Sequence, residues 1–187
     1  MWLPRLRGNN AASRKERNGY REATYLYMLA GLSVSFVGFS SLVIVFRQSA
    51  GGRLSSYDSY FVLSFMQAGF IVAAGALLPP LFALYGATEE RVLRVASAIT
   101  AIAIWLFVAS VPRRRRAATG GPAPTFIRLF LFLQLLAGLG LVLGALGRPL
   151  GPGVAPYASA LTLVLVTSGI AFLLALNVIL PGLTKAP

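Results

Sequence analysis

The stretch YLYMLAGLSVSFVGFSSLVIVF, Tyr25–Phe46, contains no charged residue. About 20 apolar residues in a helix, at a rise of 1.5 Å per residue, cross the hydrocarbon core of a bilayer. Four further stretches have a comparable length and a mainly apolar character: Tyr60–Leu78, Val92–Val111, Phe126–Gly147 and Tyr157–Leu180. The chain is therefore predicted to be an all-α, polytopic transmembrane helical bundle with five membrane-spanning helices.

The composition supports this fold class. The hydrophobic fraction is 57% and the mean hydropathy is +0.74, both too high for an ordinary soluble domain. Residues 1–21 are polar and basic, so we interpret them as a flexible N-terminal tail. Residues 22–187 form the transmembrane helical bundle in this interpretation. A bundle of five helices uses nearly all of the chain and leaves no soluble catalytic domain.

The residue types exclude most site chemistry. The chain has no cysteine and no histidine, so it cannot form a disulfide, a thiolate nucleophile, a Ser-His-Asp triad or the usual zinc site. The carboxylates are few, and none lies in the middle of an apolar stretch: Glu16, Glu22, Asp58, Glu89 and Glu90. We therefore predict no catalytic residue, no cofactor and no metal site, and we expect that the protein is not an enzyme.

Prolines are expected to shape two of the spans. Pro79-Pro80 removes two backbone donors inside an apolar run, so the second helix is predicted to be interrupted there. The third span is predicted to end at Pro112, just before the run Arg113–Arg116. After these arginines, a segment rich in Gly, Pro and Ala indicates a loop.

The formal charge of +12 comes mainly from arginines that flank the spans. Such residues hold topology and reach lipid headgroups. We expect Arg113, Arg114, Arg115 and Arg116 to lie fully solvated at the headgroup level and to contact anionic lipids, the partners that we predict. Nucleic acid is not an expected partner, because the basic segments lack a folded platform with stacking aromatic residues. At the other end of the third helix from this arginine run, Glu90 and Arg94 are predicted to form an i,i+4 pair.

The orientation in the membrane stays open. The basic tail and the four-arginine run are separated by an odd number of spans, so both cannot be cytoplasmic if every segment crosses. Either the tail sets a cytoplasmic N-terminus, or the second segment is re-entrant at Pro79-Pro80, or the orientation is reversed. The tyrosines lie close to predicted span ends, which favours the headgroup level for them: Tyr25, Tyr27, Tyr57, Tyr60, Tyr85 and Tyr157.

Small residues recur at helix-packing spacing. Gly31, Ser35 and Gly38 share one face of the first helix, Gly69 and Ala73 repeat this spacing in the second, and Gly140 and Gly144 form a GxxxG motif in the fourth. Such faces let helices approach closely in lipid. We expect them to pack within the bundle; the alternative is a homo-oligomer interface on the fourth helix.

The candidate polar residues inside the spans are Ser64 and Gln67 in the second, Gln134 in the fourth, and Ser159, Thr162, Thr167, Ser168 and Asn177 in the fifth. Gln67 and Gln134 are expected to face the bundle interior, because an unpaired amide in hydrocarbon costs several kcal/mol. These residues either form interhelical hydrogen bonds or line a narrow, uncharged polar path.

No motif in the sequence names a reaction. Our leading hypothesis is a small integral membrane protein without enzymatic activity, with a structural, accessory or lipid-interacting role. Its general composition resembles that of small inner-membrane proteins of bacteria. The alternative is a small channel or transporter, working as an oligomer, for a neutral solute or an ion. An intramembrane enzyme ranks third, since general acids and bases are missing from the spans.

Overall fold

A computed structural model describes residues 9–49, 56–119, 125–147 and 153–179 of the 187-residue chain. Within these ranges the regular structure is entirely helical, and each helix is long and apolar enough to cross a membrane. The helices are α1 (Asn9–Ser49), α2 (Ser56–Ala83), α3 (Glu89–Thr119), α4 (Thr125–Ala145) and α5 (Val154–Ile179). The predicted all-α transmembrane bundle is therefore confirmed, and the chain is an integral membrane protein.

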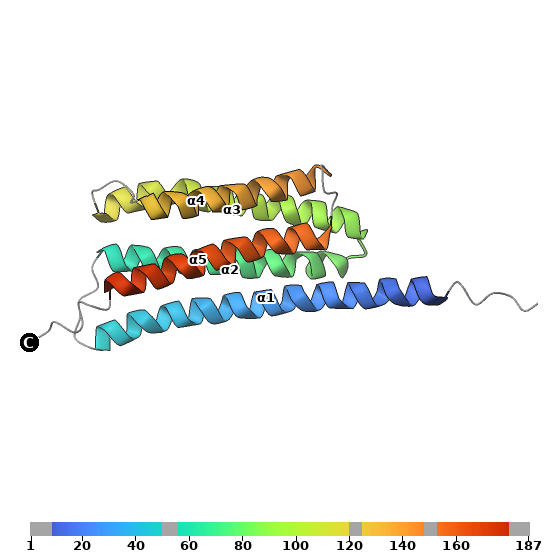
Figure 1. Ribbon diagram of the computed structural model, residues 1–187, viewed down its shortest axis with the longest axis horizontal. Coiled ribbons are helices and arrows are strands. Elements are labelled where there is room, and N and C mark those ends of the chain that lie inside the picture. The colour runs from blue at the N-terminus through green and yellow to red at the C-terminus, as the bar shows by residue number, and fades with distance from the viewer. Residues whose placement is uncertain (1–8, 50–55, 120–124, 148–152, 180–187) are drawn as a thin grey trace, which may run out of the picture.

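The helices lie nearly parallel to one another in three layers (Figure 1). α3 and α4 form one outer layer, α2 and α5 the middle layer, and α1 covers the far side of the middle layer. Helices α2, α3, α4 and α5 contact one another in a closed ring, while α1 packs mainly against α2 and more lightly against α5. The molecule is thus a four-helix bundle with one additional helix on its side.

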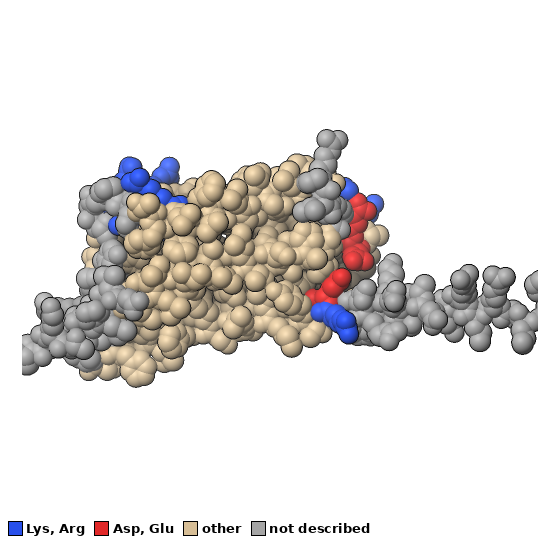
Figure 2. Space-filling view, viewed as in Figure 1, with Lys and Arg blue, Asp and Glu red and all other residues tan. Residues whose placement is uncertain are grey.

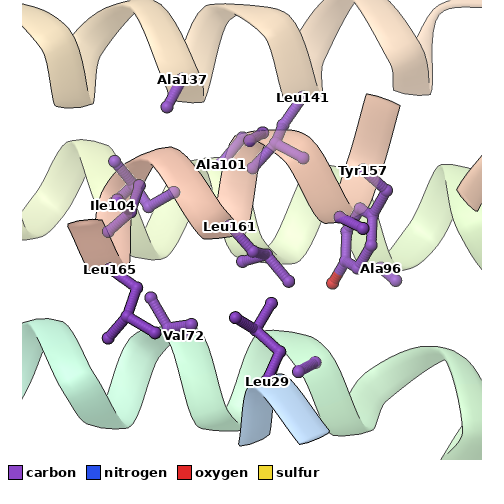
Figure 3. Packing of buried hydrophobic residues seen from close by; sticks show 14 of the residues in the cluster. Leu29, Val72, Ala96, Ala101, Ile104, Ala137, Leu141, Tyr157, Leu161 and Leu165 are labelled. Atoms are coloured by element: carbon purple, nitrogen blue, oxygen red, sulfur yellow. The ribbon is translucent and has the colours of Figure 1, made fainter. Parts of the chain in front are cut away.

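The main core fills one half of the four-helix bundle, away from the Arg113–Arg116 end of α3. Val72, Ile104 and Leu161 are almost completely buried there. Figure 3 shows side chains from all five helices meeting in this region, with Leu29 of α1 reaching the layer of α2. Large apolar side chains also cover the outside of every helix, as expected for a surface in contact with lipid.

The prediction of an interrupted second helix is wrong. α2 continues through Pro79 and Pro80 and ends at Ala83, so it crosses the full length of the bundle and is not re-entrant. Proline at position 79 removes the amide that would donate to the carbonyl of Gly75. The hydroxyl of Tyr157 donates to that carbonyl oxygen instead, at 2.6 Å. Transmembrane helices tolerate proline where a neighbouring helix satisfies the freed group in this way.

α3 likewise does not end where the sequence suggested. It includes Pro112 and continues to Thr119, so the run Arg113–Arg116 lies on helical backbone. Residues 104, 108, 111 and 115 follow one another at intervals of four, three and four, which places them on one helical face. That face is buried, and Arg115 is only 7% exposed. The expectation that all four arginines are solvated is therefore wrong for Arg115.

α1 begins at Asn9, so residues 9–21 have a helical backbone where the sequence suggested a flexible tail. Residues 1–8 lie outside the described part of the chain. The tyrosine prediction is also corrected at two positions: Tyr60 and Tyr157 are buried in the bundle, whereas Tyr25, Tyr27 and Tyr85 are exposed. The side chain of Tyr57 is outside the described residues.

The small-residue faces predicted for the first and fourth helices are open among the described residues. A Cβ atom built on Gly31, Gly38, Gly140 or Gly144 would meet nothing within 4 Å, and Ser35 is exposed. Close approach occurs at Gly69, on the small-residue face predicted for the second helix, and at Gly75. A Cβ on Gly69 would lie 2.5 Å from Val37 of α1, and one on Gly75 would lie 3.0 Å from Thr100 of α3.

Candidate functional site

The residues of the predicted polar path occupy three separate places. Ser64, Gln134 and Ser168 line one cavity, Gln67 lies in a different groove, and Thr162 lies between α5 and α1. At this third place the hydroxyl of Thr162 donates to the Ala158 carbonyl and accepts a 2.8 Å hydrogen bond from Tyr25. The side chain of Asn177 is outside the described residues. The described residues therefore do not form one continuous polar path.

The cavity, which we call the axial cavity, has a volume of about 60 Å³ and lies between α2, α3, α4 and α5. It occupies the half of the four-helix bundle nearest the arginines of α3. Aromatic and aliphatic side chains form most of its wall, with a few polar groups between them. The lining residues are Tyr60, Phe61, Ser64, Phe65, Ala68, Phe107, Val111, Ile127, Phe130, Leu131, Gln134, Ser168 and Ala171.

Gln134 is the polar group of this cavity that the structure leaves incomplete. Its side chain is only 5% exposed, so it faces the interior as expected. The amide nitrogen donates a 3.2 Å hydrogen bond to the Ser168 hydroxyl. The amide oxygen is buried and has no partner among the described residues. Ser64, by contrast, donates to the Tyr60 carbonyl of its own helix at 2.8 Å.

The other half of the bundle axis is closed. Apolar side chains from the four helices fill it, among them Val72, Ile104, Leu141 and Leu161. Beyond them the Tyr157 hydroxyl donates to the Gly75 carbonyl and is 3.1 Å from the Thr100 hydroxyl. Because the single hydroxyl proton of Tyr157 points to Gly75, Thr100 is the donor in the second bond. The axial cavity therefore ends inside the protein.

A second hollow, the α2–α3 groove, opens on the outer surface between these two helices. It has a volume of about 340 Å³ and is mostly apolar. Gln67 is half-buried in it and accepts a hydrogen bond from the guanidinium of Arg114. Gln67 thus does not face the axial cavity, contrary to expectation. The groove is lined by Gln67, Phe70, Ile71, Ala103, Leu106, Phe107, Ser110 and Arg114.

The charges of the described side chains are divided between the two ends of the bundle (Figure 2). At one end, which we call the arginine end, Arg113, Arg114, Arg116 and Arg128 are exposed. The described carboxylates all lie at the opposite end, where Glu90 pairs with Arg94 at 2.5 Å as predicted. The side chains of Glu16 and Asp58 are outside the described residues. The arginine end is thus strongly positive in the part that the structure describes.

The contact between Tyr157 and Gly75 could be predicted only in part from the sequence. The acceptor could be predicted, because Pro79 lies four residues after Gly75 and has no backbone N–H to donate to the Gly75 carbonyl. The donor could not be predicted, since no local sequence pattern shows that residue 157 lies against residue 75. The burial of Arg115 had a signal in its spacing from Val108 and Val111 once the helix continues through Pro112.

Comparison with protein-family models, with curated proteins and with solved structures finds no match to this chain. The features that bear on its function are therefore the fold, the axial cavity, the α2–α3 groove and the arginine end.

Proposed function

We propose that this protein is a non-enzymatic, accessory integral membrane protein of the bacterial inner membrane whose arginine end binds the headgroups of anionic lipids. The exposed positions of Arg113, Arg114 and Arg116 carry the proposal. Each basic residue at an anionic membrane surface contributes about 1 kcal/mol of binding free energy. The guanidinium group also forms bidentate hydrogen bonds with phosphate, which lysine cannot do in the same geometry.

The α2–α3 groove supports a defined place for one such lipid. Arg114 stands at its end, where it bonds to Gln67, and the groove continues along Phe70 and Leu106. A phosphate at Arg114 would therefore leave an acyl chain beside apolar side chains of the outer surface. This combination of a cation with an apolar groove matches the chemistry of an anionic phospholipid.

The closed half of the bundle axis supports an accessory role over a channel. A channel needs a path for solute along its length, and the core around Ile104 and Leu161 fills that position in this chain. The predicted path residues Gln67 and Gln134 also lie in different hollows. For a non-enzymatic role, the support is the residue composition: a chain without histidine or cysteine lacks two common kinds of catalytic group.

We propose in addition that α4 mediates self-association. Gly140 and Gly144 form a GxxxG pair, and a Cβ atom on either would meet no described residue within 4 Å. A second copy can approach the backbone closely at such a face.

The lipid proposal is tested with the purified full chain in a neutral detergent. Thermophoresis measures binding of two short-chain lipids, dioctanoyl phosphatidylglycerol and dioctanoyl phosphatidylcholine. We expect tighter binding of the anionic lipid than of the zwitterionic lipid. This selectivity should decrease at 1 M salt, because salt screens the electrostatic attraction between the arginines and the headgroup. Replacing Arg113, Arg114 and Arg116 with Gln should weaken binding of the anionic lipid by roughly tenfold or more.

The matched control replaces Arg21, Arg91 and Arg94 with Gln, which removes the same charge from the opposite end. This variant should keep most of the selectivity. Equal affinities for the two lipids, or equal losses in the two triple variants, would contradict the proposal. Flux of glycerol or K⁺ into proteoliposomes above that of empty vesicles would instead favour the channel.

A further inference from the structure

The axial cavity combines apolar walls with one buried polar atom that lacks a partner. Its volume of about 60 Å³ is several times the roughly 10–15 Å³ that holds one water molecule. It is also smaller than the cavity of about 150 Å³ that accommodates benzene in an engineered protein. The space therefore suits a narrow molecule of a few heavy atoms, or the end of a linear chain, and excludes a bulky ring system.

The walls decide the chemical class of the occupant. Phe61, Phe65, Phe107 and Phe130 contribute phenyl rings, and no charged side chain is among the described residues that line the cavity. An ion would have no counter-charge there and would lose its hydration. A pure hydrocarbon would leave the buried amide oxygen of Gln134 without a hydrogen bond, which costs about 1–3 kcal/mol. The occupant must therefore be neutral, mostly apolar and able to donate one hydrogen bond.

The surroundings of Gln134 favour a hydroxyl group as the hydrogen-bond donor of the occupant. The amide already engages Ser168 through its nitrogen, so its buried oxygen is the atom of the amide that is left to accept a bond from a ligand. A hydroxyl group is donor and acceptor in one atom, so it can donate to the amide oxygen and also accept a bond from a neighbouring donor. Ser64 does not compete for the amide, because its hydroxyl is bonded to the carbonyl of Tyr60.

We propose that the axial cavity is a binding site for a small linear alcohol, with its hydroxyl group on the Gln134 side chain and its hydrocarbon body between the phenylalanines of α2, α3 and α4. Such molecules dissolve in the bilayer, so the ligand is available from the lipid that surrounds the protein. The site is independent of lipid binding at the arginine end, since it uses none of the exposed arginines.

The proposal is tested with 3-fluoro-1-propanol, a linear alcohol of five heavy atoms, as the probe and ¹⁹F NMR as the measurement, on the full chain in lipid nanodiscs. Empty nanodiscs give the partition of the probe into lipid, which does not saturate. The wild-type protein should add a saturable component. An isostere without the hydroxyl, 1-fluorobutane, should bind about tenfold more weakly, because it leaves the Gln134 oxygen unpaired.

Gln134→Leu removes the amide at nearly constant volume and should weaken binding of the alcohol by about tenfold. Gln67→Leu is the matched control, since it makes the same change in the α2–α3 groove and should alter the affinity by less than about twofold. Ala171→Leu fills the axial cavity without touching the amide and should abolish the saturable component. Circular dichroism checks that each variant is folded. If Gln134→Leu does not fold, Ala171→Leu alone tests whether the alcohol binds in the axial cavity.

Absence of a saturable component in the wild type would overturn the proposal. Equal binding of the alcohol and of its isostere would overturn the role of the hydroxyl group. If the Gln134 oxygen instead holds a water molecule only, the alcohol will bind with the same affinity to wild type and to Gln134→Leu, and the proposal fails.

Discussion

The hydroxyl of Tyr157 donates a 2.6 Å hydrogen bond to the carbonyl oxygen of Gly75, the group that loses its helical donor because residue 79 is proline. Thr100 of α3 donates to the same tyrosine oxygen at 3.1 Å. Three helices therefore meet at the one carbonyl of α2 that the first proline leaves open. Gly75 allows this meeting, since a Cβ atom there would lie 3.0 Å from Thr100 and 3.1 Å from Leu161.

We predict that Tyr157→Phe lowers the free energy of unfolding by about 1–2 kcal/mol, because it leaves the buried Gly75 carbonyl without a donor. Reversible unfolding in mixed detergent and SDS micelles measures this quantity. Tyr25→Phe is the matched control, since it removes an exposed hydrogen bond to Thr162 and should cost less. Equal losses in the two variants would contradict the prediction.

The assignment of this bond to the proline has its own test. Pro79→Ala restores the backbone amide that donates to Gly75 in an ordinary helix. In that background Tyr157→Phe should cost less than half of what it costs in the wild type. The difference is the coupling energy of a double-mutant cycle. An unchanged cost of Tyr157→Phe would mean that the hydroxyl stabilises the bundle through Thr100 alone.

The sequence was sufficient for the number and approximate limits of the helices, because the length of an apolar stretch decides whether it crosses a membrane before any partner is known. It was insufficient at Pro79 and Pro112, where local chain chemistry predicted breaks. A neighbouring helix supplies the missing donor at Gly75, and that contact depends on the three-dimensional arrangement. At Pro79 the prediction from local rules therefore failed because a tertiary contact replaced the local one.

The site residues show the same division. Of the residues that the sequence singles out, Ser64, Gln134 and Ser168 line one cavity, whereas Gln67 and Thr162 lie elsewhere. The helices are apolar on the side that faces lipid and on the side that faces protein, so hydrophobicity does not show which face is inside. Gly140 and Gly144 of α4, beside which a Cβ atom would meet nothing within 4 Å, were misassigned to internal packing for this reason.

Gly69 is predicted to be essential for the packing of α1 on α2. Gly69→Ala would place a methyl group 2.5 Å from the stiff side chain of Val37 and 3.3 Å from the Ser33 carbonyl, so one helix must shift. We expect a loss of about 1–3 kcal/mol in the free energy of unfolding. Gly38→Ala, with nothing within 4 Å, should change it by less than about 0.5 kcal/mol. Similar values for both variants would show that α1 adapts to the added methyl group.

Neighbouring arginines on α3 should have opposite roles. Arg115 is buried on the face of Val108 and Val111, while Arg116 is exposed. Arg115→Gln should therefore lower the melting temperature, because it removes a buried side chain that fills the bundle. Arg116→Gln should leave the melting temperature within about 1 °C, since exposed substitutions rarely matter to stability. Its effect should appear as weaker binding of dioctanoyl phosphatidylglycerol. A reversed order of the two variants in both assays would contradict the placement of Arg115 in the interior.

The last prediction concerns self-association through α4. Since Gly140 and Gly144 meet no other part of the described chain, their replacement by Ile adds side chains to an open surface and should not affect folding of the monomer. A second copy packed on that face would be excluded by the larger side chains. We therefore expect sedimentation equilibrium in detergent to show a dimer of the wild type that weakens at least tenfold in the Gly140→Ile, Gly144→Ile variant. The corresponding change at Gly31 and Gly38 of α1, which are equally open, should leave the dimer intact. A wild type that stays monomeric at every concentration, or a dimer that only the α1 variant dissociates, would exclude α4 as the interface.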